Sequence, residues 1–521
     1  MNWTDRYTHL WDLLANSTSS LSDRTAIVEN GLRWSYQTLY QQASQLALVL
    51  QEKGVQPQDK VALFLSNQKE FVVSFMAILK IGAVVVPINI QQAPDDIGYV
   101  LLNSGSRLLI TSESFAPAFD GKPIPMLIAN QAIRNEHSWE AALEAVPVEK
   151  ALNTPPADRD PAELAVLIYT TGTTGKPKGV MLSENNLLHN MAGFDPIFQF
   201  SHEDRMLLAL PLFHAYGLII GLYGLGIGAQ ISLVPKFAPK SLIETLIQEK
   251  ITIVPLVPTL YGLLLEQAKK IGPAAFSSIR YFISGGASLP PALLKDVEST
   301  LNVIVLEGYG MTETSPVLAV NRPDEGSIPR SVGKPLPNVE IALFQDSGER
   351  IFPQPGQESP EGEILARGPN VMLGYYGLPE ETQKTITHDG WLSTGDLGRF
   401  DAEGHLYISG GRKKDLIIKA GENIAPVRIE QTLYAHPDIL EACVLGIPDT
   451  KLGEKILACV ILKPETSLTE QALKKHCRED LPALLVPDEV CFMESFPKHP
   501  SGKILKHILK SQLLEATPAS N

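Results

Sequence analysis

Short apolar runs alternate with longer mixed segments along most of this chain. The runs at 26–28, 61–65, 83–87, 251–254, 281–283 and 303–306 predict buried strands. The segments at 35–54 and 68–81 predict helices, and Ser35 has the chemistry of an N-cap for the first of them. Asn30-Gly31 lies between two short apolar runs and predicts a hairpin. Strands that alternate with helices indicate an α/β fold with parallel-rich sheets.

The composition of the chain changes near position 395. Turn residues become dense, and a smaller α+β unit is expected from about Lys414 to the end, with a disordered tail at 516–521. A chain of 521 residues is too long for one ordinary core, so two to four domains are expected.

An uncharged stretch at 206–235 is long enough to span a bilayer. It contains Pro211 and five glycines from Gly217 to Gly228, which break the pattern of a single helix. We therefore interpret this stretch as a buried strand, loop and helix that line a pocket, and no transmembrane segment is expected.

Charge and cysteine content narrow the class of protein. The formal net charge of −14 argues against nucleic acid or an anionic membrane surface as the main partner. The first residues lack the apolar core of a signal peptide, which predicts a cytoplasmic location. Four cysteines occur without any CxxC pair, so reduced thiols are expected rather than a zinc site.

The segment TTGTTGKPKG follows an apolar run at 164–169. Glycine lets backbone N–H groups approach phosphate oxygens, threonine hydroxyls donate further hydrogen bonds, and lysine supplies positive charge. A polyphosphate-binding loop is therefore predicted. Its candidate ligands are Thr170, Thr171, Gly172, Thr173, Thr174, Gly175, Lys176 and Lys178.

This loop does not fit the Walker A pattern. Its Gly-Lys pair is Gly175-Lys176, so the first glycine would fall on Thr170, and Pro177 replaces the hydroxyl residue that holds magnesium. A second strand is expected at 180–182, and Ser183 is the expected N-cap of the next helix. A P-loop kinase is thus the disfavoured alternative.

Further glycine and polar residues follow other predicted strands. Gly285 and Gly286 would let the backbone approach a flat ring, and Tyr309 could stack on a base. Thr312 could bind a phosphate and Glu313 could hold Mg²⁺. Two further candidates lie in loop-like motifs. They are Asp396, on an expected tight turn in STGD, where it could accept ribose hydroxyls, and Lys503, at the tip of a PSGK loop.

Taken in order, these motifs resemble those of the adenylate-forming superfamily, which includes acyl-CoA synthetases, adenylation domains of peptide synthetases and luciferases. The shared motifs are YTTGTTGKPKGV, PLFHAYG, SGGA, GYGMTET, GEILARGPNVMLGYY, STGDLG, GRKKDLIIKAGENIAP and PSGK. The resemblance implies a large N-terminal domain, 1–412, and a small mobile domain, 413–521. It also implies two half-reactions: a carboxylate attacks Mg·ATP to give acyl-AMP and pyrophosphate, and CoA then displaces AMP to give a thioester.

The resemblance also assigns roles. The loop from Thr170 to Lys178 would bind the β- and γ-phosphates, and Gly285, Gly286 and Tyr309 would enclose adenine. Thr312 would contact the α-phosphate, Glu313 the magnesium ion, and Asp396 and Arg412 the ribose. Lys503 would offset charge as the carboxylate attacks. Lys414 matches the hinge, and the turn around Gly421 would complete the thiol channel. His214 matches a position between the acyl pocket and that channel.

The segments that line the acyl pocket in relatives correspond to 212–227, 254–264 and 285–289, which contain no charged side chain apart from the titratable His214. An amino acid would bury its ammonium without a partner, so a medium- or long-chain fatty acid is the first expectation and an aryl acid the second. Gly217, Gly221, Gly224 and Gly226 are interpreted as leaving room for the acyl group.

The resemblance leaves several properties open. CoA is the favoured acceptor, with an acyl carrier protein as the alternative partner, and oxygenation of acyl-AMP, as in luciferases, uses the same scaffold. A nucleotide sensor without turnover is the alternative outside enzymology. Peripheral contact with a membrane and a monomeric or homodimeric state also stay open.

Overall fold

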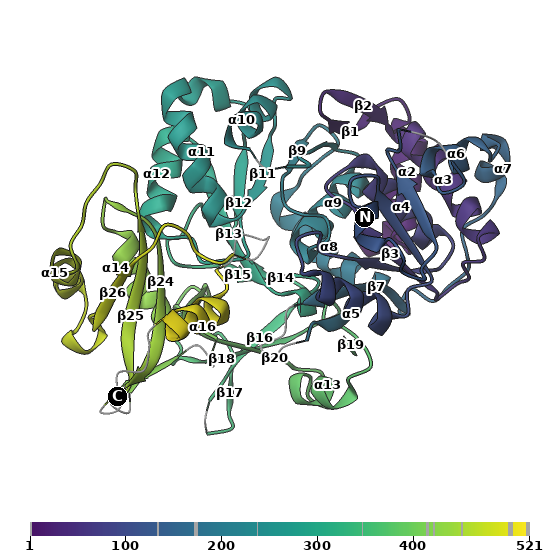
Figure 1. Ribbon diagram of the computed structural model, residues 1–521. Coiled ribbons are helices and arrows are strands. Elements are labelled where there is room, and N and C mark those ends of the chain that lie inside the picture. The colour runs from purple at the N-terminus through teal and green to yellow at the C-terminus, as the bar shows by residue number, and fades with distance from the viewer. Residues whose placement is uncertain are drawn as a thin grey trace.

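A computed structural model describes residues 3–132, 135–170, 176–236, 238–345, 347–412, 416–419, 422–449, 452–498 and 504–516. Four sheets organise this structure, two of them large and mixed and two of them five-stranded. The chain runs from an N-terminal region on the right of Figure 1 to a C-terminal lobe on the left. This arrangement confirms the expected α/β class, with a large N-terminal region and a smaller C-terminal domain.

The first large sheet carries the predicted phosphate loop. Its strand order is β19-β8-β7-β4-β3-β5-β6. The strands β7, β4, β3, β5 and β6 are parallel, whereas β8 is antiparallel to β7 and β19 is antiparallel to β8. Its bounds are β3 (Lys60–Phe64), β4 (Val84–Pro87), β5 (Leu108–Ser112), β6 (Met126–Ala129), β7 (Leu164–Thr170), β8 (Lys178–Ser183) and β19 (Gly374–Tyr375).

The second large sheet carries further candidate residues, Tyr309 among them. Its order is β15-β14-β13-β12-β11-β9-β10-β1-β2, with a parallel centre from β13 to β1 and antiparallel edges. Its bounds are β1 (Thr25–Glu29), β2 (Leu32–Ser35), β9 (Arg205–Leu208), β10 (Gln230–Leu233), β11 (Ile253–Leu256), β12 (Tyr281–Ser284), β13 (Ile304–Gly310), β14 (Val317–Val320) and β15 (Lys334–Pro335).

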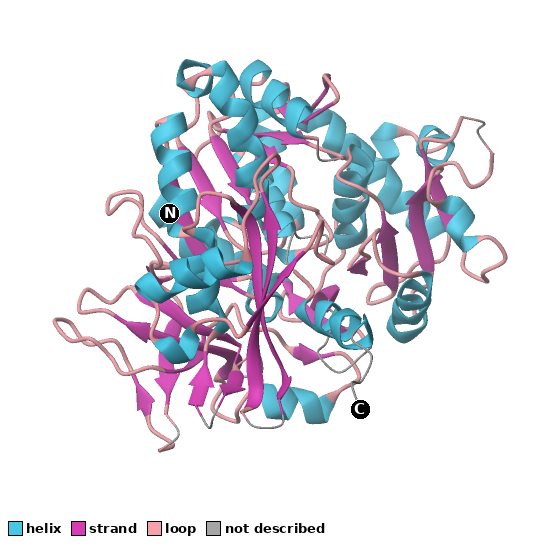
Figure 2. Cartoon of the chain, turned by 60° about the vertical axis from the view of Figure 1, so that its left-hand side comes forward, coloured by secondary structure: helices cyan, strands magenta, loops and turns pink. Residues whose placement is uncertain are grey.

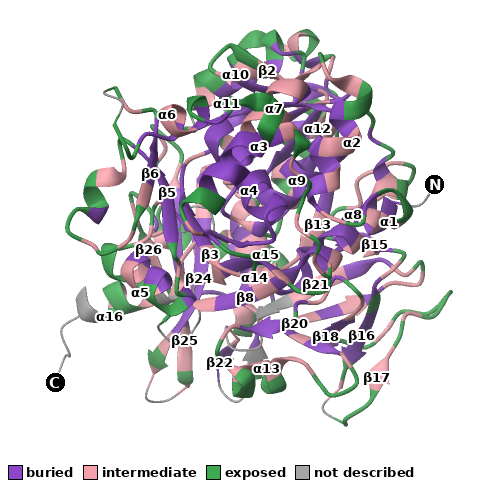
Figure 3. Cartoon of the chain, turned by 90° about the vertical axis from the view of Figure 1, so that its right-hand side faces the viewer, coloured by how far each residue is buried: buried purple, intermediate pink, exposed green. Residues whose placement is uncertain are grey.

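Helices cover these two sheets, and their apolar residues form the main core. Every residue of α4 is buried, as a helix enclosed by other elements requires, and Figure 3 shows buried residues gathered in the sheets and in α3, α4 and α9. The helices are α1 (Trp3–Arg6), α2 (Trp11–Leu21), α3 (Tyr36–Glu52), α4 (Lys69–Lys80), α5 (Pro94–Ser104), α6 (Trp139–Glu144), α7 (Val148–Asn153), α8 (Glu184–Phe198), α9 (Ala215–Ile227), α10 (Pro239–Gln248), α11 (Pro258–Ile271) and α12 (Pro291–Leu301), and the short 3₁₀ turns are η1 (Ala116–Phe119), η2 (Pro273–Phe276) and η3 (Thr312–Thr314).

Beyond β15 lie an antiparallel sheet and the C-terminal lobe. The sheet order is β17-β16-β18-β20-β21, and its elements are β16 (Glu340–Phe344), β17 (Arg350–Ile351), β18 (Gly362–Arg367), α13 (Pro379–Thr385), β20 (Leu392–Phe400) and β21 (Leu406–Arg412). The lobe, which comes forward in Figure 2, has cores of its own. It contains β22 (Ile417–Lys419), β23 (Glu422–Ile424), α14 (Pro426–Tyr434), β24 (Ile439–Asp449), β25 (Gly453–Leu462), α15 (Glu470–Asp480), η5 (Ala483–Leu485), β26 (Glu489–Phe492) and α16 (Lys506–Ala516).

Local signals in the sequence are confirmed where turn and cap chemistry is strong. Asn30 and Gly31 have φ of 50° and 80° in the tight turn that joins β1 to β2. The Ser35 hydroxyl accepts a hydrogen bond from the Thr38 N–H at 3.2 Å and begins α3. The stretch at 206–235 is a strand, a loop, a helix and a strand, as interpreted, and no described helix is both long and apolar enough to cross a membrane.

The glycines of α9 contradict one interpretation. A Cβ atom added at Gly217 would lie 2.3 Å from the Pro211 carbonyl oxygen, and one added at Gly226 would lie 2.8 Å from a methyl carbon of Leu13. Gly221 and Gly224 have neighbours at 3.1 Å and 3.0 Å in the same test. These glycines let α9 pack closely against its surroundings, and they do not leave room for an acyl group.

Candidate active site

The predicted phosphate loop joins two antiparallel strands. Thr170 at the end of β7 is the register partner of Lys178 at the start of β8, and the Ser183 hydroxyl then caps α8. The strand-to-strand connection confirms the distinction from a Walker A loop, which leads from a strand into a helix. Thr171, Gly172, Thr173, Thr174 and Gly175 lie outside the described residues.

The two lysines of the loop contact aromatic rings. Lys178 Nζ lies 5.3 Å from the centre of the Tyr375 ring and 2.8 Å from Glu381 Oε2. Hydrogen bonds from Lys178 and Lys384 hold the pKa of Glu381 down at about 2, so this carboxylate is charged at neutral pH. Lys176 Nζ lies 5.3 Å from the centre of the Tyr99 ring. The loop therefore carries two ammonium groups, one of which is already paired with a carboxylate.

The candidate magnesium ligand lies close to the same tyrosine. Glu313 belongs to η3, is 8% exposed, and accepts a hydrogen bond from the Tyr375 hydroxyl at Oε1 over 2.9 Å. Thr312 is the first residue of the same turn and is half-buried. A buried carboxylate oxygen is a suitable ligand for a hard cation such as Mg²⁺, so the residues present fit that ion.

The residues predicted to bind the adenosine part of ATP also lie close together. The Tyr309 hydroxyl donates to Asp396 Oδ2 at 2.6 Å, and Asp396 is the register partner of Arg412 on β21. The expected tight turn at Asp396 is wrong in form, because the residue lies inside strand β20, although Gly395 before it has a φ of 75°. An aromatic ring beside a carboxylate is an arrangement that can bind a base and a ribose together.

Gly285 and Gly286 follow strand β12. A Cβ at Gly285 would lie 3.1 Å from the Tyr216 ring, and the Tyr216 hydroxyl donates to the Ile283 carbonyl oxygen at 3.1 Å. His214 precedes α9, with its ring centre 4.7 Å from that of Phe213. Gly285, Tyr216 and His214 thus belong to the region where α9 meets the end of β12.

A buried acid supports the turn after Gly286. Glu307 at the end of β13 is 6% exposed and accepts a hydrogen bond at Oε1 from the Leu289 N–H over 2.9 Å. Burial raises the pKa of Glu307 to about 8, although the bond from Leu289 acts in the opposite direction. The carboxyl therefore keeps its proton at neutral pH and holds the turn without adding charge.

The remaining predicted residues are not placed. Lys503, Lys414 and Gly421 lie outside the described residues, and the structure says nothing of them. On either side of this undescribed segment in the sequence, Lys498 and Ile504 form an isolated antiparallel bridge.

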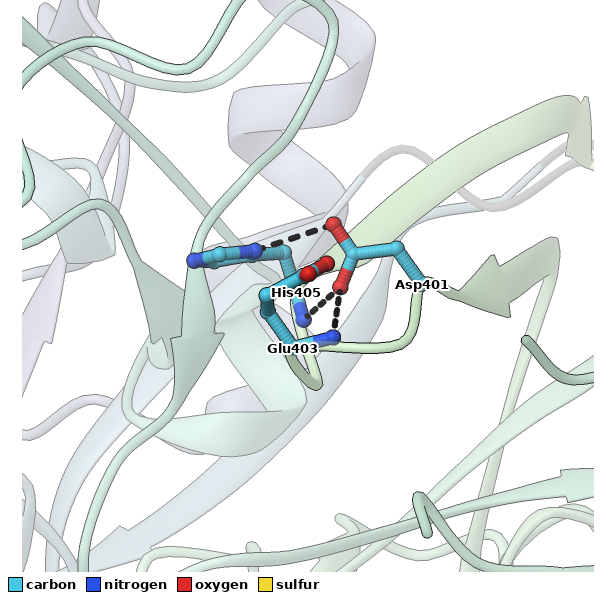
Figure 4. Close-up of side chains that lie close together, drawn as sticks. All are labelled: Asp401, Glu403 and His405. Atoms are coloured by element: carbon cyan, nitrogen blue, oxygen red, sulfur yellow. Dashed lines mark hydrogen bonds and ion pairs between the residues drawn. The ribbon is translucent and has the colours of Figure 1, made fainter. Parts of the chain in front are cut away.

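A group of acidic and histidine side chains between β20 and β21 lies close enough to hold a metal ion (Figure 4). Within it Asp401 already accepts hydrogen bonds from the backbone N–H groups of Glu403 and His405, at 3.0 Å and 2.8 Å, and from the Tyr407 hydroxyl at 3.2 Å. His405 Nδ1 lies 2.9 Å from Asp401 Oδ2, and His405 Nε2 lies 3.2 Å from Glu325. These hydrogen bonds are typical of a turn stabilised by an aspartate side chain, so we interpret the group as structural and not as a metal site.

Reasoning from the sequence missed three residues that contact the candidate site residues or the turn that follows them, namely Tyr216, Tyr375 and Glu307. Tyr216 and Tyr375 are letters of the motifs PLFHAYG and GEILARGPNVMLGYY, and Glu307 directly precedes GYGMTET. Nothing in their spacing indicates which partner each contacts, because these partners come from other strands and loops.

Comparison with known proteins places this geometry in a family. The family model of AMP-binding enzymes matches residues 14–376, and that of the AMP-binding enzyme C-terminal domain matches residues 428–503. The chain is 32% identical to an oxalate–CoA ligase of Arabidopsis thaliana, over 96% of this chain and 98% of that relative. It is 33% identical to a long-chain-fatty-acid–CoA ligase of Bacillus subtilis, over 97% of this chain and 95% of the relative.

Solved structures agree with the sequence comparison. The anthranilate CoA ligase AuaEII in complex with anthranoyl-AMP superposes with a TM-score of 0.89 at 28% identity, covering 99% of this chain and 100% of the other. The chain belongs to the AMP-binding, adenylate-forming enzymes. Within that family it is an AMP-forming acid–CoA ligase, which uses ATP and CoA as substrates, with the Mg²⁺ that is typical of the family.

Proposed function

We propose that this ligase activates a monocarboxylic acid with an apolar body, in the first place a medium- or long-chain fatty acid. The observation that carries the proposal is the lack of Asp, Glu, Lys and Arg in the three segments that the resemblance assigns to the acyl pocket, 212–227, 254–264 and 285–289. A second charged group on the substrate would be buried there without a partner, at a cost of several kcal/mol. The fatty-acid ligase among the relatives supports this choice.

The nucleotide roles are proposed from the motif resemblance together with the contacts described above. Tyr309 supplies a ring for adenine, next to the Gly285-Gly286 turn, and Asp396 supplies oxygens for the ribose hydroxyls. Glu313 holds the magnesium ion, Thr312 contacts the α-phosphate, and the 170–178 loop binds the outer phosphates. Arg412, the register partner of Asp396, is assigned to the ribose as well.

The C-terminal lobe, assigned to 413–521, supplies the remaining groups. Lys503 places an ammonium between the attacking carboxylate and the α-phosphate, where it offsets the repulsion of two anions. Rotation about Lys414 then withdraws Lys503 and brings in the turn around Gly421, while His214 borders the path of the thiol. The substrate carboxylate is itself the nucleophile, so no enzyme nucleophile is required.

A substrate panel tests the proposal. Pyrophosphate release is measured with octanoate, palmitate, benzoate, oxalate and an amino acid, and AMP is identified by chromatography. We expect the fatty acids to give the highest kcat/KM, and CoA rather than a phosphopantetheinyl carrier protein to accept the acyl group. Preference for oxalate, the substrate in the name of the Arabidopsis relative, would refute an uncharged pocket.

The Lys503→Ala variant tests the role of the lobe. It should lose formation of acyl-AMP by several orders of magnitude, while thioester formation from supplied acyl-AMP stays within a few-fold of wild type. Lys498→Ala, which removes an exposed ion pair with Glu441, is the matched control and should leave both half-reactions intact. Equal loss of both half-reactions in Lys503→Ala would show that the assignment is wrong.

Aryl acids are the second candidate. The Tyr216 ring lies against the Gly285 backbone, so a planar acid could stack beside it. The anthranilate ligase is a structural neighbour of this chain. A higher kcat/KM for benzoate than for octanoate would favour this candidate over the first.

A further inference from the structure

The strap formed by residues 372–376 connects two parts of the candidate site that are far apart in the sequence. The Met372 N–H donates to the carbonyl oxygen of Glu313 at 2.9 Å, and the Tyr376 N–H donates to that of Gly179 at 2.8 Å. Between these two anchors, β19 pairs with β8, and Tyr375 is the register partner of Val180. The strap therefore fixes the turn that holds Glu313 relative to the strand that begins with Lys178.

The Tyr375 side chain makes contacts on both sides of this connection. Its hydroxyl donates to Glu313 Oε1 at 2.9 Å, and its ring lies 5.3 Å from Lys178 Nζ. Tyr375 and Glu313 are each 8% exposed, so the hydrogen bond is largely shielded from water. One side chain thus contacts the candidate magnesium carboxylate and a candidate phosphate-binding ammonium.

The backbone around Tyr375 is held in place by its own neighbours. The Tyr375 N–H donates to Thr382 Oγ1 at 2.8 Å, and that hydroxyl donates to the Leu378 carbonyl oxygen at 3.0 Å. Gly374 has a φ of 137°, and a Cβ there would lie 2.7 Å from a side-chain carbon of Thr382. The position of Tyr375 is therefore fixed by β8 on one side and by the start of α13 on the other.

We propose that Tyr375 is a positioning residue for Mg·ATP: its hydroxyl orients the Glu313 carboxylate, and its ring supports the Lys178 ammonium. A carboxylate has two oxygens, and a hydrogen bond to Oε1 fixes the direction in which the other oxygen points. Hydrogen-bond partners of this kind orient a metal ligand without touching the metal. The ring face attracts the ammonium through a cation–π contact. This inference rests on the proposed roles of Glu313 and Lys178.

Direct binding of ATP, with no acid present, tests the two contacts separately. The dissociation constant is measured by equilibrium dialysis with Mg²⁺ and again with EDTA. Tyr375→Phe removes the hydroxyl and keeps the ring, so Mg·ATP should bind about tenfold more weakly, while ATP with EDTA binds as in wild type. Tyr375→Leu removes both groups, so ATP with EDTA should also bind about threefold more weakly.

Tyr407→Phe is the matched control, because it also removes a tyrosine hydroxyl that donates to a carboxylate, that of Asp401. It should bind both forms of ATP as wild type does. Melting temperatures of Tyr375→Phe and Tyr407→Phe should change by similar amounts. A Tyr375→Phe protein with wild-type affinity for Mg·ATP, or one that loses affinity equally with Mg²⁺ and EDTA, would overturn the inference.

Glu313→Gln separates failure of the inference from failure of the proposed function. If Mg²⁺ strengthens ATP binding in wild type but not in Glu313→Gln, the role of Glu313 stands, and Tyr375→Phe then tests Tyr375 alone. If Mg²⁺ has the same effect in wild type and in Glu313→Gln, the metal role of Glu313 is wrong. The inference for Tyr375 then falls with it.

Discussion

The buried acid Glu307 gives a pH-dependent stability that can be calculated from its surroundings. Its side chain is 6% exposed, and burial raises its pKa from 4.5 to about 8. The folded protein therefore keeps this proton up to about pH 8, whereas the unfolded chain releases it near pH 4.5. Between these values the unfolded state binds fewer protons, so this group makes the free energy of unfolding fall as pH rises.

The pKa values set the magnitude of this loss. The difference between 8 and 4.5 is about 3.5, and each pKa unit corresponds to about 1.4 kcal/mol, so the whole loss is on the order of 5 kcal/mol by pH 8. Glu307→Gln cannot titrate, and its amide oxygen can still accept the bond from Leu289. The cost of burying its amide N–H group does not depend on pH, so that cost cancels when two pH values are compared.

Melting temperatures at pH 5.5 and pH 8.5 measure the effect. Relative to wild type, Glu307→Gln should gain several degrees on going from pH 5.5 to pH 8.5. Glu340→Gln, which changes an exposed carboxylate on β16, is the control and should show no such pH-dependent gain. An identical difference between wild type and Glu307→Gln at both pH values would refute a protonated Glu307.

Two further predictions concern other charged groups. Glu381→Gln removes the carboxylate that pairs with Lys178 at 2.8 Å, so Lys178 no longer has to break an ion pair before it binds phosphate. The Kd for ATP, measured by equilibrium dialysis, should therefore fall about two- to threefold. A higher Kd would show that Glu381 assists ATP binding. Lys80 is 2% exposed, and burial lowers its pKa to about 8, whereas the unfolded chain keeps that proton until about pH 10.5. The ionisation of Lys80 should therefore raise the free energy of unfolding of the wild type as the pH rises from 8 to 10.5, and Lys80→Met should lack this rise. The measurement is the urea midpoint of both proteins at about pH 7.5 and about pH 10. The same difference between the two midpoints at both pH values would contradict the prediction.

Predictions from the sequence are confirmed where the determining chemistry lies within a few residues. The turn at Asn30-Gly31 needs only two residues that tolerate a positive φ, and the caps at Ser35 and Ser183 need only a hydroxyl near the first free N–H groups of a helix. The strand-to-strand character of the 170–178 loop follows in the same way from its local composition. Element bounds differ by only a few residues, because end residues depend on packing as well as on local preference.

The contacts that assemble the site could not be predicted in this way. Tyr375 meets Glu313 across 62 residues, and Lys178 meets Glu381 across 203. Both contacts depend on β19 pairing with β8, and β19 is only two residues long and leaves no periodic pattern in the sequence. The motifs therefore predict Lys178 and Glu313 individually. The contact of Tyr375 with both of them could be found only once the strand order was known.

The glycines of α9 show a different limit. A glycine in a helix can leave open space beside it, or it can allow another segment to pack closely against the helix. The sequence is the same in both cases, because it does not show whether a neighbouring atom fills the place of the missing Cβ. At Gly217 that missing atom would lie 2.3 Å from a backbone oxygen, so the neighbour rather than the glycine decides the meaning. The proposal of an apolar substrate consequently rests on the lack of charged side chains in the segments assigned to the acyl pocket. A Gly217→Ala change should destabilise α9 and should not shift the choice of substrate.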